Sequence, residues 1–188
     1  MKKKSKKFVA IIIAALAIII TGGVVAYLTD TDTATNTFTI GAVDIDLTED
    51  NWNETNAQHV VPGQVINKDP AVDNTGSNSA YVYIKVEEPV VALSESGTGP
   101  LLTYTVNNGW TQLSTNTSGS TKTTVYYYNN PLAAGSSTTA LFNNVTVSEF
   151  NQATVSGSKN MVVTAYAIQS NDLPAGTTIA SAYNDYFA

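Results

Sequence analysis

The stretch Ala80-Tyr-Val-Tyr-Ile-Lys-Val-Glu-Glu-Pro-Val90 contains the clearest β-strand pattern of the chain. Its aliphatic residues Val82, Ile84 and Val86 fall on alternate positions. Successive side chains of a strand point to opposite faces, so the other face carries Tyr81, Tyr83, Lys85 and Glu87. This pattern predicts a strand that buries one face in the core of a β-sheet domain.

Shorter segments rich in β-branched and aromatic residues lie on both sides of this strand. Gly, Pro, Asn and Ser residues, which favour turns, separate them. Asn107-Asn108-Gly109 is typical of a two-residue hairpin turn, so its flanking segments are expected to pair with each other. The predicted strands are 43–47, 64–68, 71–73, 80–90, 102–106, 110–113, 122–128, 138–142 and 160–170.

The remaining segments predict loops and short helical turns. Residues 114–121 contain only Ser, Thr, Asn and Gly, which favours a flexible loop. A short helical turn capped by Ser148 is expected within 145–150, and 179–187 has near-helical spacing of its apolar residues. About eight to ten short strands with regular turns predict an all-β fold, a jelly-roll-like antiparallel β-sandwich with short helical turns.

The chain begins with an export signal. Five lysines within Met1–Lys7 precede an almost wholly apolar segment, and Val24-Val25-Ala26 places small residues at a cleavage site. We expect cleavage between Ala26 and Tyr27, which would make the protein secreted or exposed at the cell surface and leave it in the membrane only before signal removal. The alternative is an uncleaved anchor, because residues 8–28 are long enough to span a bilayer. The expected organisation is a signal peptide at 1–26, an N-terminal segment at 27–40 and a β-sandwich domain at 41–188.

The N-terminal segment has threonine at every odd position from 29 to 39. In an extended chain these side chains share one face, while Asp30, Asp32 and Asn36 on the other leave little apolar surface for folding alone. The segment is therefore either a disordered linker or a strand that pairs with the sheet edge of another molecule. The candidate pairing residues are Tyr27, Leu28, Thr29, Thr31, Thr33, Thr35, Thr37, Phe38 and Thr39.

Composition excludes several classes of function. Removing the five signal-peptide lysines leaves four basic residues against fifteen acidic ones, so the processed chain has a formal charge of 4 − 15 = −11. Such a charge repels nucleic acids and anionic lipids. The chain has no cysteine, which excludes disulfides and thiolate metal sites.

No catalytic residues, metal site or cofactor are predicted. His59 is the only histidine, and a zinc protease of the His-Glu-x-x-His type needs two, so His59 is interpreted as an ordinary loop residue. The carboxylate pairs Asp30/Asp32, Asp44/Asp46 and Glu87/Glu88 are interpreted as weak calcium ligands or as a solvated acidic surface. Lys85 either forms an isopeptide bond or packs its aliphatic stem on tyrosines.

Several motifs, in their order and spacing, resemble the TasA/camelysin family of exported biofilm-matrix proteins of Gram-positive bacteria. The motifs are Gly23-Val-Val-Ala-Tyr-Leu-Thr-Asp30, Thr37-Phe-Thr-Ile-Gly41, Val43-Asp-Ile-Asp-Leu47, Pro62-Gly63, Lys68-Asp69, Val72-Asp-Asn-Thr-Gly-Ser77 and Ala80-Tyr-Val-Tyr-Ile84. Later pieces, among them Trp110, Val125-Tyr-Tyr-Tyr128 and Ala165-Tyr-Ala-Ile-Gln169, are most similar to the BsaA-like, pilus-forming branch.

This resemblance implies a jelly-roll domain that polymerises outside the cell after processing by a dedicated signal peptidase of the SipW type. It also implies donor-strand exchange, in which the mature N-terminus inserts as a strand into the next subunit; residues 27–39 take that role here. Camelysin carries a metalloprotease label, but nothing in this sequence matches a zinc site.

The first hypothesis for function is therefore a secreted structural subunit that forms a head-to-tail homopolymer in biofilm-matrix fibres or pili. Two alternatives remain open. One is a secreted, camelysin-like metalloprotease. The other is a monomeric cell-surface binding module that uses Trp52, Trp110 and Tyr126–Tyr128 as contacts.

Overall fold

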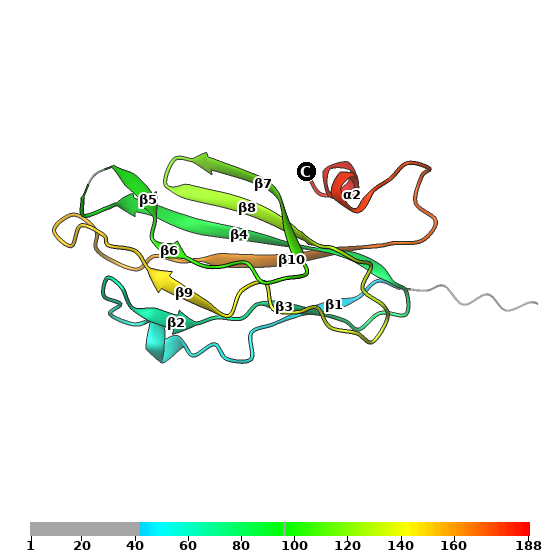
Figure 1. Ribbon diagram of the computed structural model, residues 1–188, viewed down its shortest axis with the longest axis horizontal. Coiled ribbons are helices and arrows are strands. Elements are labelled where there is room, and N and C mark those ends of the chain that lie inside the picture. The colour runs from blue at the N-terminus through cyan, green and yellow to red at the C-terminus, as the bar shows by residue number, and fades with distance from the viewer. Residues whose placement is uncertain (1–41, 96) are drawn as a thin grey trace, which may run out of the picture. The chain divides into compact units, whose positions relative to one another are not determined.

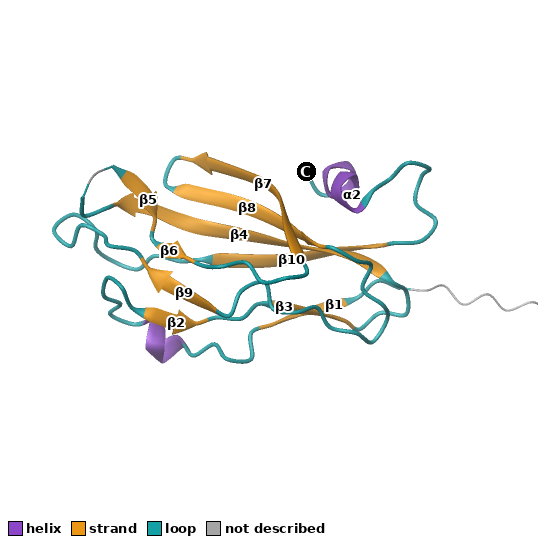
Figure 2. Cartoon of the chain, in the orientation of Figure 1, coloured by secondary structure: helices purple, strands orange, loops and turns teal. Residues whose placement is uncertain are grey.

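The computed structural model describes residues 42–95 and 97–188 (Figure 1). This part of the chain is mostly β, with short helical segments (Figure 2). The predicted signal peptide and N-terminal segment lie outside the described residues. The elements are β1 (Ile45–Thr48), the 3-10 helix η1 (Glu54–Ala57), β2 (Val65–Asn67), β3 (Ala71–Asn74), β4 (Ala80–Ala92), β5 (Thr98–Pro100), β6 (Leu102–Thr103), β7 (Trp110–Ser118), β8 (Thr121–Tyr128), β9 (Asn144–Val147), β10 (Val162–Gln169) and α2 (Ile179–Tyr186).

The strands form three antiparallel sheets, which confirms the β class predicted from the sequence. The largest sheet has the order β10-β4-β8-β7, and β5 pairs with the far end of β4. The two smaller sheets are β1-β3 and β2-β9-β6. In Figure 1 the large sheet lies on one side and the smaller sheets lie on the other. No helix in the described part has the length and hydropathy needed to cross a membrane.

The main core lies between the large sheet and the smaller ones. The alternation predicted for β4 is confirmed, because Val82, Ile84 and Val86 are completely buried and all contribute to this core. Phe142 and Val145 pack against them from the opposite side. Apolar burial of this kind is the main favourable contribution to folding of a chain that has no disulfides.

A second, smaller core lies on the other face of the large sheet, where α2 covers it. Tyr83 of β4 is completely buried there, and its hydroxyl donates to the Ile179 carbonyl at 2.7 Å. The Tyr83 and Tyr183 rings lie 5.3 Å apart. Helix α2 agrees with the predicted helical spacing, and Thr178 and Ser181 form a capping box at its start.

The predicted flexible loop at 114–121 is wrong, because β7 continues to Ser118 and pairs with β8 along its length. Thr115 and Thr124 lie opposite each other, and their hydroxyl oxygens are 3.0 Å apart. Threonine is β-branched and fits a pleated surface, so a segment that looks like a polar loop is extended when a partner strand lies beside it.

The predicted hairpin around Asn107-Asn108-Gly109 is also wrong. Gly109 does make a turn with φ of +100°, but the strand before it, β6, pairs with β9, while β7 pairs with β8. The Asn107 amide donates to Leu141, and the Trp110 indole donates to Thr139. The turn therefore carries the chain from one sheet to another instead of closing a hairpin.

Two further predictions fail in the segment that follows β8. Residues 138–142 form no regular strand, although the Thr138 amide donates to the Val72 carbonyl at 2.9 Å. No helical turn forms at 145–150, because the first part of this segment belongs to strand β9. Val145 and Val147 are both 1% exposed, and this period of two fixes an extended backbone.

Glu87 and Glu88 do not form a shared acidic surface, because adjacent strand residues face opposite sides. Glu87 pairs with Lys85 on the outer face at 3.3 Å. Glu88 is 1% exposed on the core side, and Lys122 donates to one of its carboxylate oxygens at 3.1 Å. The other oxygen has no hydrogen-bond partner among the described residues. Desolvation by burial raises the pKa of Glu88 above its ordinary 4.5, against the opposing effect of Lys122.

We expect Glu88 to make the stability of the protein depend on pH. The raised pKa means that the folded protein holds this proton more tightly than the unfolded chain does. The contribution of Glu88 to the free energy of unfolding is therefore fully present below the ordinary pKa and is lost as the pH rises through the raised one. Relative to Glu88→Gln, the wild type should lose stability as the pH rises from acid to neutral, as measured by urea denaturation.

The exposed Glu54 supplies the matched control, because Glu54→Gln also removes one carboxylate. A difference between the wild type and Glu88→Gln that increases with pH in favour of the wild type would show that the Lys122 pair outweighs desolvation.

Candidate functional site

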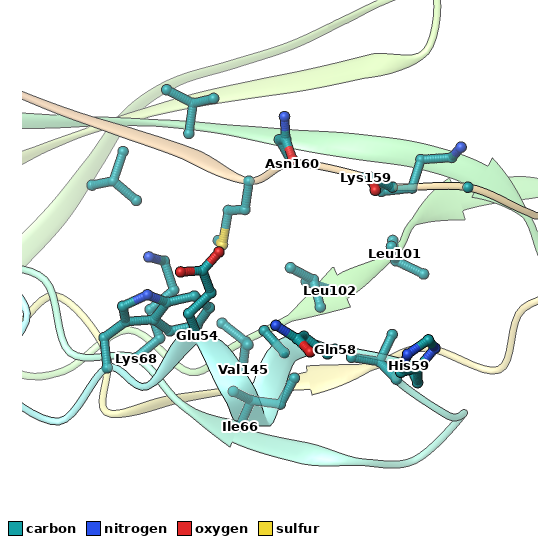
Figure 3. A pocket seen from close by; sticks show the side chains of 18 of the residues that line it. Glu54, Gln58, His59, Ile66, Lys68, Leu101, Leu102, Val145, Lys159 and Asn160 are labelled. Carbon is teal, nitrogen blue, oxygen red and sulfur yellow. The ribbon is translucent and has the colours of Figure 1, made fainter.

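A groove of about 1250 Å³ opens in the described part of the chain. It lies at the Leu47 end of β1 and at the Val162 end of β10. In Figure 3, Glu54, Gln58 and His59 lie on one side, and Lys159 and Asn160 lie on the other. The groove therefore separates the segment around η1 from the segment that leads into β10.

The floor of the groove is aliphatic. Ile66, Leu101 and Val145 belong to the main core and are 4%, 6% and 1% exposed. Met161 and Val163 pack beside them and are only half-buried. The groove thus reaches the edge of the main core, and an apolar side chain that enters it would pack against core residues and extend the core.

Exposed apolar side chains surround the opening. Leu47 and Trp52 are each 37% exposed, and Val162 is 47% exposed. Leu47 shares the parity of the half-buried Val43 and Ile45, but it is exposed at the groove. A cluster of exposed apolar side chains beside an open core is typical of an interaction site.

Two strand edges without a partner among residues 42–95 and 97–188 border the groove. Within these residues, β1 pairs only with β3, and β10 pairs only with β4. Parts of β1 and β10 approach within 8 Å of each other, yet the two strands are not hydrogen-bonded neighbours. Each edge offers backbone N–H and C=O groups to an additional strand.

The charged residues of the groove balance, unlike those of the body. Lys68 donates to both carboxylate oxygens of Glu49 at 2.7 and 2.8 Å, and its ammonium lies 4.5 Å from the centre of the Trp52 ring. Lys159 and Glu54 add one charge of each sign. Residues 42–188 carry 4 lysines and 13 acidic residues, a formal charge of 4 − 13 = −9. The groove is thus neutral within an acidic body, so it is a place where a second acidic molecule is repelled least.

His59 lies in a loop segment, as predicted from the sequence. This residue follows η1, has a φ of 54° and lines the groove. The described residues contain no group of three or more His, Cys, Asp or Glu side chains that could hold a metal ion.

Two of the five aromatic contacts expected of a binding module are buried in the core. Trp110 and Tyr126 are 6% and 5% exposed and belong to the main core. Tyr127 and Tyr128 are half-buried, whereas Trp52 is exposed and lines the groove. Lys85 pairs with Glu87 and lies 6.0 Å from the centre of the Tyr166 ring, which fits a lysine packed on tyrosines.

The sequence-predicted site residues, Ala26 and Tyr27 at the cleavage site and the candidate pairing residues from Tyr27 to Thr39, lie outside the described part of the chain. Sequence reasoning did not find the groove. Its lining comes from segments that are far apart in the sequence, 47–60, 66–68, 101–102, 145–150 and 155–163. The one local signal was Trp52, a large aromatic residue in a polar segment.

Comparisons with curated proteins and with solved structures found no match to this chain. A comparison with family models did find one, described as the camelysin metallo-endopeptidase family. That model matches residues 1–124, which is more than half of the 188 residues, and the protein therefore belongs to the camelysin family.

Proposed function

We propose that the protein is a secreted structural subunit of extracellular fibres, and that residues 27–40 of one copy lie as a strand in the groove of the next copy. The observation that supports this proposal is the groove itself, which reaches the edge of the main core beside two strand edges that have no partner among the described residues. An added strand would gain backbone hydrogen bonds along β10 or β1. Its apolar side chains would pack against the aliphatic floor of the groove and extend the core.

The chemistry of the N-terminal segment supports this pairing. Its threonines favour an extended backbone, and Leu28 and Phe38 supply apolar side chains for the aliphatic floor. Asp30 and Asp32 are acidic, and the groove holds two of the four lysines of the body, Lys68 and Lys159. Lys68 is already paired with Glu49, so Lys159, which has no ion-pair partner among the described residues, is the lysine left to attract these carboxylates and favour one register of the strand.

The direction of the chain favours insertion into a neighbour. Ala42 is held at the β3–β4 turn, where its amide donates to Ser77 at 3.0 Å and its carbonyl accepts from the Ser77 amide. The groove lies at the other end of β1, beyond Leu47. A contact between one end of a subunit and the opposite end of the next does not close on itself, so it propagates into a fibre.

The remaining parts of the proposal follow from the resemblance described above. A dedicated signal peptidase of the SipW type would cleave between Ala26 and Tyr27 and free the segment. The protein would belong to the BsaA-like, pilus-forming branch of its family and would assemble as a homopolymer in the biofilm matrix.

A metallo-endopeptidase is the second candidate, because the matching family model carries that description. The two functions are separable by experiment. Casein turnover by the purified protein, lost in His59→Ala and with a chelator, would identify the protease.

A substitution that places charge in the groove tests the fibre proposal. We expect the double variant Leu47→Asp/Val162→Asp to fold normally, because both side chains are exposed, and to lose fibre formation. Two carboxylates in an apolar groove must be desolvated when a strand enters, which we expect to weaken insertion by roughly tenfold or more. Sedimentation and electron microscopy of the purified protein measure this loss.

Val61→Asp/Val65→Asp is the matched control, since these valines are 58% and 60% exposed and do not line the groove. Equal fibre yields from the two double variants would place the contact elsewhere.

A further inference from the structure

The outer edge of β7 has no strand partner in the described part of the chain. There, β7 ends the large sheet and pairs only with β8 (Figure 1). Apart from these pairs, no backbone hydrogen bond involves Thr111–Ser118 in the described part of the chain. From Ser114 to Ser118 every residue is exposed. One side of the backbone is therefore available along this edge.

This edge lacks the features that usually prevent edge-to-edge pairing. Charged side chains, prolines and bulges are the common means of protection. Residues 101–121 contain no charged residue and no proline, although residues 42–188 have a net charge of −9. A bulge occurs between Gln112 and Ser114, but the register of Ser114–Ser118 with β8 is regular. Uncharged, Thr- and Asn-rich segments of this kind pair readily with copies of themselves.

The other strand edges of the described part differ from β7. Strands β2, β5 and β6 have only three, three and two residues. Strand β1 carries the exposed Asp46 and follows the exposed Asp44. Strand β10 borders the groove. Strand β7 differs from all of these, because its edge is long, carries no charge and does not border the groove.

We propose that the β7 edge pairs with the same edge of a second copy of this chain, antiparallel and across a two-fold axis. A second copy fits this edge because the edge is uncharged, whereas the rest of the body is acidic and repels another copy. At this edge, therefore, two backbones can approach within hydrogen-bonding distance. A two-fold contact uses the same patch on both partners, so one neutral edge is enough. The pairing joins subunits side by side and does not depend on the groove or on residues 27–40.

A single-cysteine scan tests the geometry of this contact. The chain has no cysteine, so Ser114→Cys, Thr115→Cys, Asn116→Cys, Thr117→Cys and Ser118→Cys each introduce one thiol. After mild oxidation with copper phenanthroline, we expect the yield of disulfide-linked dimer to peak at one or two neighbouring positions. Antiparallel strands related by a two-fold axis bring a residue close to its own copy only near that axis. Asn130→Cys, at the exposed turn that follows β8 and outside the proposed pairing of Ser114–Ser118, is the control. A flat profile, or yields equal to that control, would overturn the proposal.

A charge variant separates this contact from the fibre contact. Ser114→Asp/Asn116→Asp places like charges across the proposed pairing, and Asn130→Asp/Ala134→Asp adds the same charge at an exposed turn. Both pairs are compared in the full protein and in a variant that lacks Tyr27–Asn36. We expect the β7 variant to weaken side-by-side association by roughly tenfold in both backgrounds, by electron microscopy and analytical ultracentrifugation.

The two proposals fail in different ways in this experiment. If fibres form but the β7 variant associates side by side as strongly as its control, the β7 contact is refuted and the fibre proposal stands. If no fibres form, yet the protein dimerises and the β7 variant does not, the β7 contact stands and the fibre proposal fails.

Discussion

A variant that lacks Tyr27–Asn36 is expected to fold normally and to form no fibres. The main core draws its buried side chains from Ile66 to Val147, so the body keeps its principal apolar contacts without this segment. The groove stays open in every subunit, because no copy supplies the strand that would fill it. Circular dichroism should show the β-sheet signal of the wild type, and electron microscopy should show no filaments.

Mixing two defective variants provides the control for this experiment. The deletion variant keeps an intact groove, and Leu47→Asp/Val162→Asp keeps an intact N-terminal segment. Each alone should form no fibres, but together they should form a complex that contains the two variants in equal amounts, which size-exclusion chromatography can measure. Normal filaments from the deletion variant would refute the proposed mechanism.

Phe142→Ala is expected to cause the largest loss of stability of any single substitution proposed here, about 3–5 kcal/mol. Phe142 is completely buried, and its ring lies 4.3 Å from that of Tyr104. Truncation removes a large apolar side chain from the middle of the main core and leaves a cavity that its neighbours fill only in part. The free energy of unfolding, measured by urea denaturation, should fall by this amount.

Phe150→Ala is the matched control, because Phe150 is half-buried and lines the groove. Its truncation removes less buried area, and the surrounding space is already open to solvent. We expect a clearly smaller loss, and equal losses for the two variants would contradict the position of Phe142 in the core.

The strands that the sequence predicted well have their own hydrophobic period. In β4, the alternation of Val82, Ile84 and Val86 with tyrosines is enough to identify the strand and its buried face. Helix α2 is similar, because the spacing of Ile179, Ala182 and Tyr183 places all three against the large sheet. In such segments the local pattern and the tertiary contacts agree.

The predictions that failed depend on partners that are distant in the sequence. Ser114–Ser118 has no apolar period, and it is a strand because β8 lies beside it. The turn at Asn107–Gly109 has the residues of a hairpin, but contacts with Thr139 and Leu141 direct the two flanking segments into different sheets. The groove is the extreme case, since it exists only where separate segments of the folded chain come together.

The position of Ala42 also has a mechanical consequence for a fibre. Tension passed from one subunit to the next would enter the body at Ala42 and run along β1 toward the groove. The hydrogen bonds that join β1 to β3 lie across the strand direction. A pull along the fibre would load all of these bonds together in shear instead of peeling them apart one by one, so the β1–β3 pair would resist stretching.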